Sequence, residues 1–470
     1  MNSNSSTSTR SSAAEQVAAI TARLDRLPAT RSIWMLVILL SIGGCFEMYD
    51  LFVVGYVSPG LIRAGIFHNG AQGLFGFSDQ ATFASVTFIG LFIGTMAFSF
   101  VADRFGRRII FMLSLLWYAV ADIFLSMQHA AIGIDVFRFI AGVGIGVELV
   151  TIDSYISELV PKSIRGRAFA INQCIQFIAV PIVAFLSWRL IPMAPLGVAG
   201  WRFVVLFPAL GAIFVWFIQR RVPESPRWLA GRGYVEDADR VTSRLEAQVA
   251  ADIGAELPPP GALVIDTSKA SFSEIWHPPF RKRTIMMSVF NFFQSIGFYG
   301  FASWVPALVA ARGHTVTKSL EYSFFIAALY PVAPLLFSLF ADKFERKWQI
   351  VVAAIGIGVF GIIFAMQSSP AMLVLFGAGI TLSIILMSYS YHAYQAELFP
   401  TRVRARAVGF VYSFSRISAA ISAFMIAFFL QNFGDIGVFA FIAASMVVVV
   451  VSIGVFGPRT RGLALEEISH

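Results

Sequence analysis

Glu47 and Asp50 are two acids inside a long apolar stretch, residues 33–57, near the start of the chain. Three residues is close to one helical turn, so on a helix both side chains face the same side. Two carboxyl groups that close do not both ionise easily, so one of them can take up and release a proton near neutral pH. The pair predicts a proton-coupling site. The alternative is that one acid pairs permanently with a basic residue and only holds helices together.

Other polar side chains interrupt apolar stretches and could contact a small solute. Amides and hydroxyls offer neutral hydrogen bonds, an imidazole can share a proton pathway, and a guanidinium suits a carboxylate. For the neutral side chains, hydrogen bonds between helices are an equal alternative. Arg416 is expected to bind an acidic solute or to pair with an acid elsewhere, whereas Asp122 is expected to be structural. The predicted solute-binding residues are Glu148, Gln173, Gln176, Asn291, Gln294, Tyr299, Tyr389, His392 and Arg416.

Motifs of enzymes and of metal sites are missing from the sequence. It contains no His-Glu-x-x-His, no Gly-x-Ser-x-Gly and no phosphate-binding loop of a transport ATPase. Cys45 and Cys174, the two cysteines, form neither a disulfide framework nor a metal cluster. Three alternate glycines at 142–146 lie inside an apolar stretch, which favours close helix packing over a dinucleotide loop. We therefore expect no enzyme, no metal and no cofactor.

Composition shows what must position these side chains. Of 470 residues, 57% are hydrophobic and 13% charged, whereas soluble domains carry about 25% charged residues. The apolar runs are near 20 residues long, which suits helices that cross a bilayer rather than strands of a barrel. The sequence predicts twelve membrane spans at about 33–57, 80–102, 108–128, 132–156, 167–190, 201–219, 284–310, 320–340, 348–367, 370–395, 405–430 and 436–457.

These spans divide the chain into two halves. We expect a tail over 1–30, six helices over 31–219, a linker over 220–283, six more helices over 284–457 and a second tail over 458–470. Within the first tail, apolar residues at helical spacing predict an amphipathic helix over 13–27 that lies on the membrane surface.

Basic residues predict the orientation. Of 35 lysines and arginines, 28 fall in the tails, the linker and the loops on their side. Six fall on the opposite side, Arg138 among them, and Arg416 falls within a span. This bias predicts that both termini and the linker are cytoplasmic in a multi-pass protein of the cell membrane. It also explains the net charge of +8 without nucleic acid.

Two charged motifs repeat at a single offset. The motif that begins at Ala102 returns at Ala341, and the motif that begins at Glu158 returns at Glu397. Both copies lie 239 positions after the first. Transporters are often built from such repeats, with the solute site near mid-membrane between them.

These motifs resemble a known family. Asp103-Arg104-Phe105-Gly106-Arg107-Arg108 resembles the signature of the major facilitator superfamily between its helices 2 and 3. Pro223-Glu224-Ser225-Pro226-Arg227-Trp228-Leu229 and the motif at 158–166 resemble the sugar-porter branch. Phe46-Glu47-Met48-Tyr49-Asp50 is similar to the acidic motif of bacterial metabolite–proton and aromatic-acid–proton symporters. The resemblance implies an all-α fold of twelve transmembrane helices in two pseudo-symmetric halves.

The resemblance also implies a cytoplasmic gate of ion pairs that break as the two halves rock. Three positions depart from the pattern, since Ser99, Ser338 and Glu345 replace usual glycines. The stretch 291–299 resembles the sugar-binding helix only in part, which argues against a hexose. The expected gate residues are Asp103, Arg107, Arg108, Glu158, Arg165, Asp342, Arg346, Glu397 and Arg404.

The sequence as a whole predicts a secondary active transporter. We expect proton-coupled symport of a small polar metabolite, either an organic acid or a sugar-like solute, by alternating access in a monomer. The expected partners are the solute, protons and the lipid bilayer. The alternatives are a uniporter, a drug–proton antiporter, and a non-transporting receptor on the same scaffold.

Overall fold

The computed structural model describes residues 4–68, 76–261, 272–278, 280–338, 343–399 and 401–460, and within these ranges the chain forms helices and no strand. The α-helices are α1 Asn4–Asp25, α2 Arg31–Arg63, α3 Asp79–Phe105, α4 Arg107–Ser126, α5 Ala131–Leu159, α6 Arg165–Phe177, α7 Ala179–Leu190, α8 Gly200–Leu206, α9 Leu210–Arg221, α10 Pro226–Gly231, α11 Val235–Ile253, α12 Phe280–Ala302, α13 Val305–Ala310, α14 Val316–Ala327, α15 Ala333–Ser338, α16 Arg346–Met366, α17 Pro370–Glu397 and α18 Thr401–Phe456.

Each of the first ten predicted spans coincides with one helix or with a pair of shorter helices. Four spans are split in two, as α6–α7, α8–α9, α12–α13 and α14–α15. A proline lies at or beside each break, at Pro181, Pro208, Pro306 and Pro331. Proline lacks a backbone N–H and collides with the preceding turn, so a helix bends or restarts there. The last two predicted spans instead share α18, which changes direction at Gly434, where φ is +66°.

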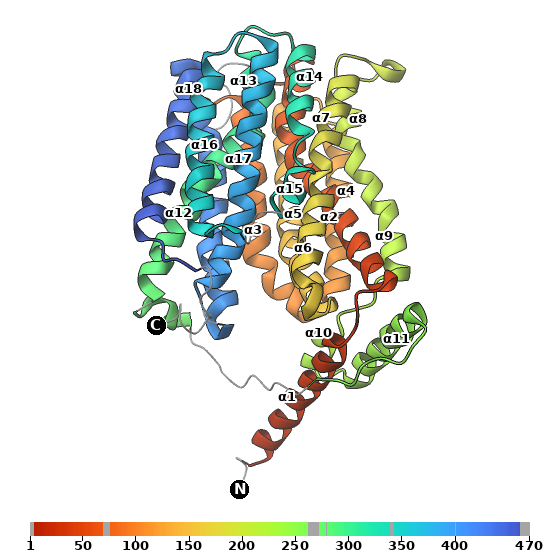
Figure 1. The fold of residues 1–470 in the computed structure, drawn as a ribbon. Coiled ribbons are helices and arrows are strands. Elements are labelled where there is room, and N and C mark those ends of the chain that lie inside the picture. Colours follow the sequence, from red (N-terminus) through yellow and green to blue (C-terminus); the bar gives the residue numbers. More distant parts are fainter. Residues whose placement is uncertain are drawn as a thin grey trace.

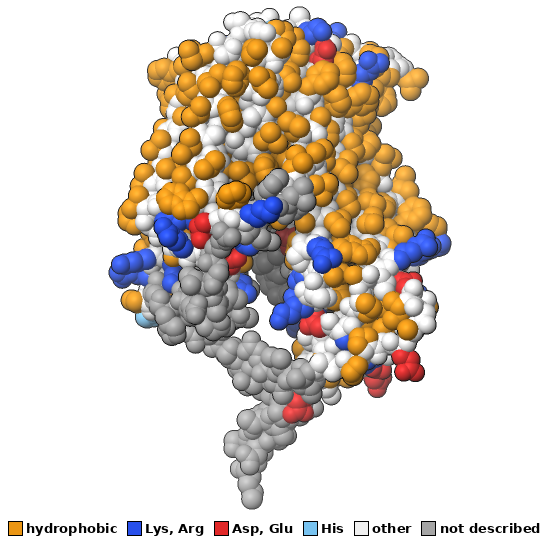
Figure 2. Space-filling view, viewed as in Figure 1, with side chains coloured by type: hydrophobic (Ala, Val, Ile, Leu, Met, Phe, Trp, Pro, Cys, Tyr) orange, Lys and Arg blue, Asp and Glu red, His pale blue; other side chains and the backbone are white. Residues whose placement is uncertain are grey.

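The helices form two bundles that stand side by side (Figure 1). Among the described residues, eight helical segments are long and apolar enough to cross a membrane. Hydrophobic side chains cover the flank of the molecule, and charged side chains gather at its two ends (Figure 2). That distribution suits a bilayer around the middle of the bundle. The architecture is that of the twelve-helix fold that the sequence predicts.

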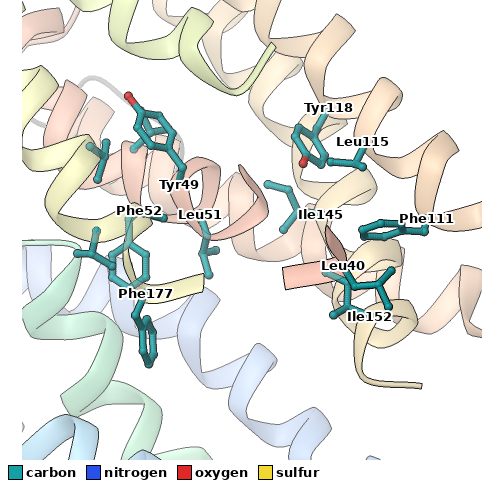
Figure 3. Packing of buried hydrophobic residues seen from close by; sticks show 14 of the residues in the cluster. Leu40, Tyr49, Leu51, Phe52, Phe111, Leu115, Tyr118, Ile145, Ile152 and Phe177 are labelled. Atoms are coloured by element: carbon teal, nitrogen blue, oxygen red, sulfur yellow. The ribbon is translucent and has the colours of Figure 1, made fainter. Parts of the chain in front are cut away.

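Inside the first bundle, aromatic and branched side chains fill the space between neighbouring helices. Phe111, Leu115 and Tyr118 of α4 pack with Ile145 and Ile152 of α5 in one hydrophobic cluster (Figure 3). The bundles meet through α3 with α18, α7 with α14, α6 with α15 and α2 with α13. The central helices of each half therefore face one another.

The N-terminal helix α1, predicted to lie on the membrane surface, packs its apolar residues against other parts of the chain. Its apolar residues Ile20 and Leu24, with Leu27 just beyond it, are at most 4% exposed. They pack against the linker helices α10 and α11, beyond one end of the bundle (Figure 1). The apolar face that suggested lipid contact is used for protein contact, because α11 supplies a complementary apolar face.

Ion pairs hold α1 against α11. Arg23 Nη2 lies 2.7 Å from Glu246 Oε2, and Arg26 Nη2 lies 2.5 Å from Glu246 Oε1. Partial burial acts to raise the pKa of Glu246, but the hydrogen bonds from Arg23 and Arg26 outweigh burial and lower the pKa below its ordinary value of 4.5. A lowered folded-state pKa means that this contribution to docking is complete above pH 4.5 and is lost as the pH falls through the folded-state value.

Glu246→Gln is expected to loosen α1. Losing the charge on Glu246 weakens two partly exposed ion pairs, at a cost of about 1–2 kcal/mol. The undocked fraction of α1 should then rise roughly five- to thirtyfold. The mobility of a spin label at position 16 measures this, and in the wild type it should also rise on acidification below pH 4.5. Glu15→Gln, on the exposed side of α1, is the matched control. Equal mobility in both variants at every pH would contradict the assignment.

Candidate functional site

Arg138 on α5 is fully buried between acids from two neighbouring helices. Its Nη1 donates to Asp50 Oδ1 on α2 at 2.6 Å and lies 3.7 Å from Asp122 Oδ1 on α4. Nη2 donates to the Asp50 carbonyl oxygen, and Nε donates to Thr87 Oγ1 on α3 at 3.1 Å. Four helices of the first half thus enclose one guanidinium together with two carboxyl groups.

This arrangement corrects one expectation and extends another. Arg138 does not belong to the opposite face of the membrane, because it has 0% exposure within the bundle, which leaves five basic residues on that side. Asp122, expected to be structural, lies in the same cluster as Asp50. The available signal was the position of Arg138, six residues inside a predicted span, where an arginine needs a partner.

Glu47 and Glu148 are two further buried acids of the first half. Glu47 is 1% exposed, its Oε1 has no hydrogen-bond partner, and it interacts electrostatically with Asp50, Asp153 and Arg416. Glu148 is 0% exposed and accepts a hydrogen bond from Ser114 Oγ at 3.5 Å. The shared environment of Glu47 and Asp50 agrees with their spacing on one helix.

Arg416 on α18 lies in the second half and faces these acids. It is 2% exposed. Its Nη1 donates to Tyr299 Oη at 2.9 Å and its Nη2 to Tyr412 Oη at 3.2 Å, and its guanidinium lies 4.8 Å from the Tyr412 ring centre. Among the residues that the structure describes, no carboxylate oxygen lies within 4.0 Å of Arg416. Glu47 and Asp153 act on it only through longer-range electrostatics.

Each half contributes one exposed residue near the site. Asp153 on α5 and His392 on α17 are exposed, although both lie on helices of the bundle. The His392 ring stacks on Tyr391, with 4.1 Å between centroids, and lies 5.8 Å from the ring of Tyr412. The exposed surface of His392, beside the ring of Tyr412, brings solvent-accessible surface close to Arg416.

The neutral candidates divide between helix packing and the site. Asn291 Nδ2 donates to the Met287 carbonyl of its own helix at 2.9 Å, so its amide is partly used locally. Gln294 is 4% exposed. Gln176 packs against Gly44, where an added Cβ would meet its Nε2 at 2.4 Å. Gln173 and Tyr389 are half-buried. Tyr299 is the candidate that the structure brings directly to Arg416.

At the end of the bundle that carries α10 and α11, the repeated motifs form equivalent contacts. Arg107 lies 3.1 Å from Glu158, and Arg346 lies 2.6 Å from Glu397, in each case within one half. Arg165 donates to the Val160 carbonyl and Arg404 to the Phe399 carbonyl, five residues back in both cases. The internal repeat is therefore also a repeat of contacts. The side chain of Asp103 and all of Asp342 lie outside the described residues.

Contacts of Glu224 explain why the first copy of the signature has a glycine at position 106. The second copy has Glu345 at the equivalent position. Glu224 accepts the backbone N–H groups of Arg107 and Arg108, while the Arg108 side chain donates to the Gln219 carbonyl. Gly106 has φ +100°, and an added Cβ would lie 2.3 Å from Glu224 Oε2. In the second copy Glu345 accepts the Thr460 N–H at 3.0 Å. The acid there binds the chain that follows α18.

At the opposite end the two halves touch backbone to backbone. An added Cβ on Gly55 of α2 would lie 1.9 Å from the carbonyl oxygen of Ser303, between α12 and α13. The Phe52 ring also packs against Tyr330 of the second half, with 5.9 Å between centroids. In this conformation the halves are therefore closed against each other at the end away from α10 and α11.

The chain is similar to known transporters over nearly its whole length. A family model described as sugar (and other) transporter matches residues 36–470. A putative metabolite transport protein, YyaJ of Bacillus subtilis (strain 168), is 32% identical, covering 93% of this chain and 95% of its own. The niacin transporter NiaP of Acinetobacter baylyi is 23% identical, covering 96% and 99%. The xylose transporter XylE from E. coli, in a partially occluded inward-open structure, has TM-score 0.72 at 19% identity, covering 92% and 99%.

Proposed function

The chain belongs to the sugar (and other) transporter family, and on that premise we propose that it is a proton-coupled symporter of a small organic acid. Asp50 and Arg138 carry the proton-dependent step in this proposal, with Glu47 beside them. Arg416, with Tyr299 and Tyr412, holds the carboxylate of the solute between the halves.

The observation that supports an acidic solute is the difference between the two buried guanidinium groups. Arg138 is neutralised inside the first half by Asp50 at 2.6 Å. Among the described residues, Arg416 has hydrogen bonds only to the hydroxyls of Tyr299 and Tyr412. A buried charge without a close counterion is costly, so a carboxylate that enters from water gains a strong partner there. Niacin, named for one relative, is itself a carboxylic acid.

Proton coupling follows from the position of Asp50. A protonated Asp50 no longer neutralises Arg138, so gaining or losing the proton changes the charge balance at the centre of the first half. Glu47 and Asp153 act on Arg416 from across the interface between the halves. A solute carboxylate bound at Arg416 competes with Glu47 and Asp153 for its positive charge. Solute binding therefore weakens the electrostatic attraction between Arg416 in the second half and these two acids in the first half. Proton and solute thus act on the same interface between the halves.

The remaining elements of the proposal concern topology. The 28 basic residues of the tails, linker and adjoining loops support a cytoplasmic location of both termini. The pairs Arg107–Glu158 and Arg346–Glu397 then lie at the cytoplasmic rim, where rearrangement between states forms the gate. One chain supplies both halves of the site, so we propose that a monomer is sufficient for transport.

Arg416→Gln is expected to reduce binding of an anionic solute by roughly ten- to hundredfold. Losing charge-assisted hydrogen bonds costs about 1.5–3 kcal/mol. Arg416→Lys keeps the charge but loses the two-nitrogen geometry, so its loss should be smaller. The test is equilibrium binding and proteoliposome uptake of radiolabelled nicotinate, benzoate and xylose by the purified protein.

Arg240→Gln, an exposed arginine on α11, is the matched control for the Arg416 variants. It should bind and transport as the wild type does. Unchanged binding and uptake in both Arg416 variants would exclude this residue from the pathway. If the Arg416→Gln variant still binds xylose, and neither nicotinate nor benzoate is bound, the proposed solute would be sugar-like instead of an organic acid.

A further inference from the structure

We propose that Asp122 is a second acceptor for Arg138, and that the guanidinium shifts from Asp50 to Asp122 when Asp50 takes up a proton. This inference rests on the proposed proton symport. It assigns a positioning role to a third residue, on α4, which no known motif of the sequence contains.

The geometry shows one nitrogen between two acids. Arg138 Nη1 is hydrogen-bonded to Asp50 Oδ1 at 2.6 Å, while Asp122 Oδ1 lies on the same nitrogen at 3.7 Å. A hydrogen bond from nitrogen to oxygen needs about 2.7–3.2 Å, so a movement of roughly 1 Å exchanges one acceptor for the other. Nε is held by Thr87 Oγ1, and the Phe83 ring lies 5.8 Å from the guanidinium carbon. Nη2 donates to the Asp50 carbonyl oxygen, so Nε and Nη2 can keep their partners while Nη1 changes acceptor.

The net charge of Asp50, Asp122 and Arg138 explains why the guanidinium would move to Asp122. Asp50, Asp122 and Arg138 all have 0% exposure. With both acids ionised the trio carries one net negative charge, and one proton from water on Asp50 brings it to zero. With Asp50 alone, that proton would leave a buried guanidinium without a counterion, which is strongly unfavourable. Asp122 supplies the counterion, so Arg138 is neutralised whether or not Asp50 is protonated.

The other titratable groups around Asp50, Asp122 and Arg138 are not placed to act as the counterion of Arg138. On α2 the neighbouring titratable groups are Glu47 and Tyr49, on α4 Tyr118, and on α5 Glu148. Tyr49 donates its hydroxyl to the Val204 carbonyl at 2.9 Å. Of the described acids, only Asp50 and Asp122 lie within 4.0 Å of Arg138. Asp122 is thus the acid placed to receive the guanidinium.

The test is the dependence of uptake on external pH for Asp122→Asn in proteoliposomes with an inward proton gradient. Without the second acceptor, protonation of Asp50 is less favourable, so the pH of half-maximal uptake should fall by about one to two units. Uptake at neutral pH should drop at least tenfold and recover in more acidic medium. Counterflow of solute at zero gradient should stay within about twofold of the wild type, because exchange needs no net proton release.

A structural role alone would lower uptake by the same factor at every pH, and that result, or an unchanged profile, would overturn the proposal. Asp122→Glu retains a carboxylate and should keep the wild-type midpoint within about half a unit. If Asp122→Asn does not reach the membrane, Asp122→Ala removes the acceptor with a smaller, apolar side chain and should give the same acid shift. If uptake by the wild-type protein does not respond to the proton gradient, proton symport itself is refuted. A failure of the Asp122 proposal alone would leave the wild-type response to the gradient intact, so the two outcomes can be distinguished.

Discussion

Asp50→Asn is expected to abolish the concentration of solute by a proton gradient while leaving solute exchange in place. Asparagine has nearly the shape of aspartate and can still accept the hydrogen bond from Arg138 Nη1, which is 2.6 Å long in the native site. It cannot bind and release a proton at physiological pH. Gradient-driven uptake should therefore fall at least a hundredfold, which corresponds to about 2.7 kcal/mol or more of lost coupling.

The measurement compares proteoliposome uptake with and without an inward proton gradient and adds counterflow at zero gradient. Asp135→Asn makes the same change on α5, where Asp135 is half-buried and outside the Arg138 cluster, and should preserve coupling. Glu47→Gln should act more mildly, by moving the pH optimum. Accumulation by Asp50→Asn in response to the gradient would place the coupling site elsewhere, with His392 and Glu148 as the next candidates.

Gly55→Trp is expected to stop transport by holding the two halves apart. The Cβ alone would stand 1.9 Å from the Ser303 carbonyl oxygen, so any side chain at position 55 strains the closed contact between α2 and the second half. Overpacking costs about 1–3 kcal/mol even for small additions. Gly55→Ala should therefore shift the conformational equilibrium roughly five- to hundredfold, and Gly55→Trp should exclude the closed state altogether.

A thiol reporter can follow this equilibrium. In a variant without Cys45 and Cys174, Ser303→Cys should react slowly with a membrane-impermeant reagent, because Ser303 is 4% exposed. Adding Gly55→Trp should speed that reaction at least tenfold while solute binding persists. Gly358→Ala is the matched control, since its added Cβ meets only Ala443, at 3.7 Å, within one half. Transport by Gly55→Trp at the wild-type rate would contradict the role of this contact.

The resemblance and the internal repeat predicted the repeated charged motifs around the site better than the pairing of charges within it. The offset of 239 residues that relates the two motifs in the sequence also relates Arg107–Glu158 to Arg346–Glu397 in space. Glu47 and Asp50 were identified because acids are rare within apolar spans. Arg138 was misplaced because it sits near the end of a predicted span, where a basic residue ordinarily marks a loop.

The sequence alone determined that the chain is an all-helical membrane protein with two equivalent halves, because apolar runs and repeated motifs are local properties that need no knowledge of packing. Which charges meet was decided only by the tertiary structure. Asp50, Asp122 and Arg138 lie on three different helices, up to 88 residues apart, and periodicity within one helix cannot tell which face meets which neighbour. The same holds for Gly55 and Ser303, whose contact depends on how one half rests against the other. Buried charges are stabilised by partners brought from distant parts of the chain, so the site exists only once the helices are packed.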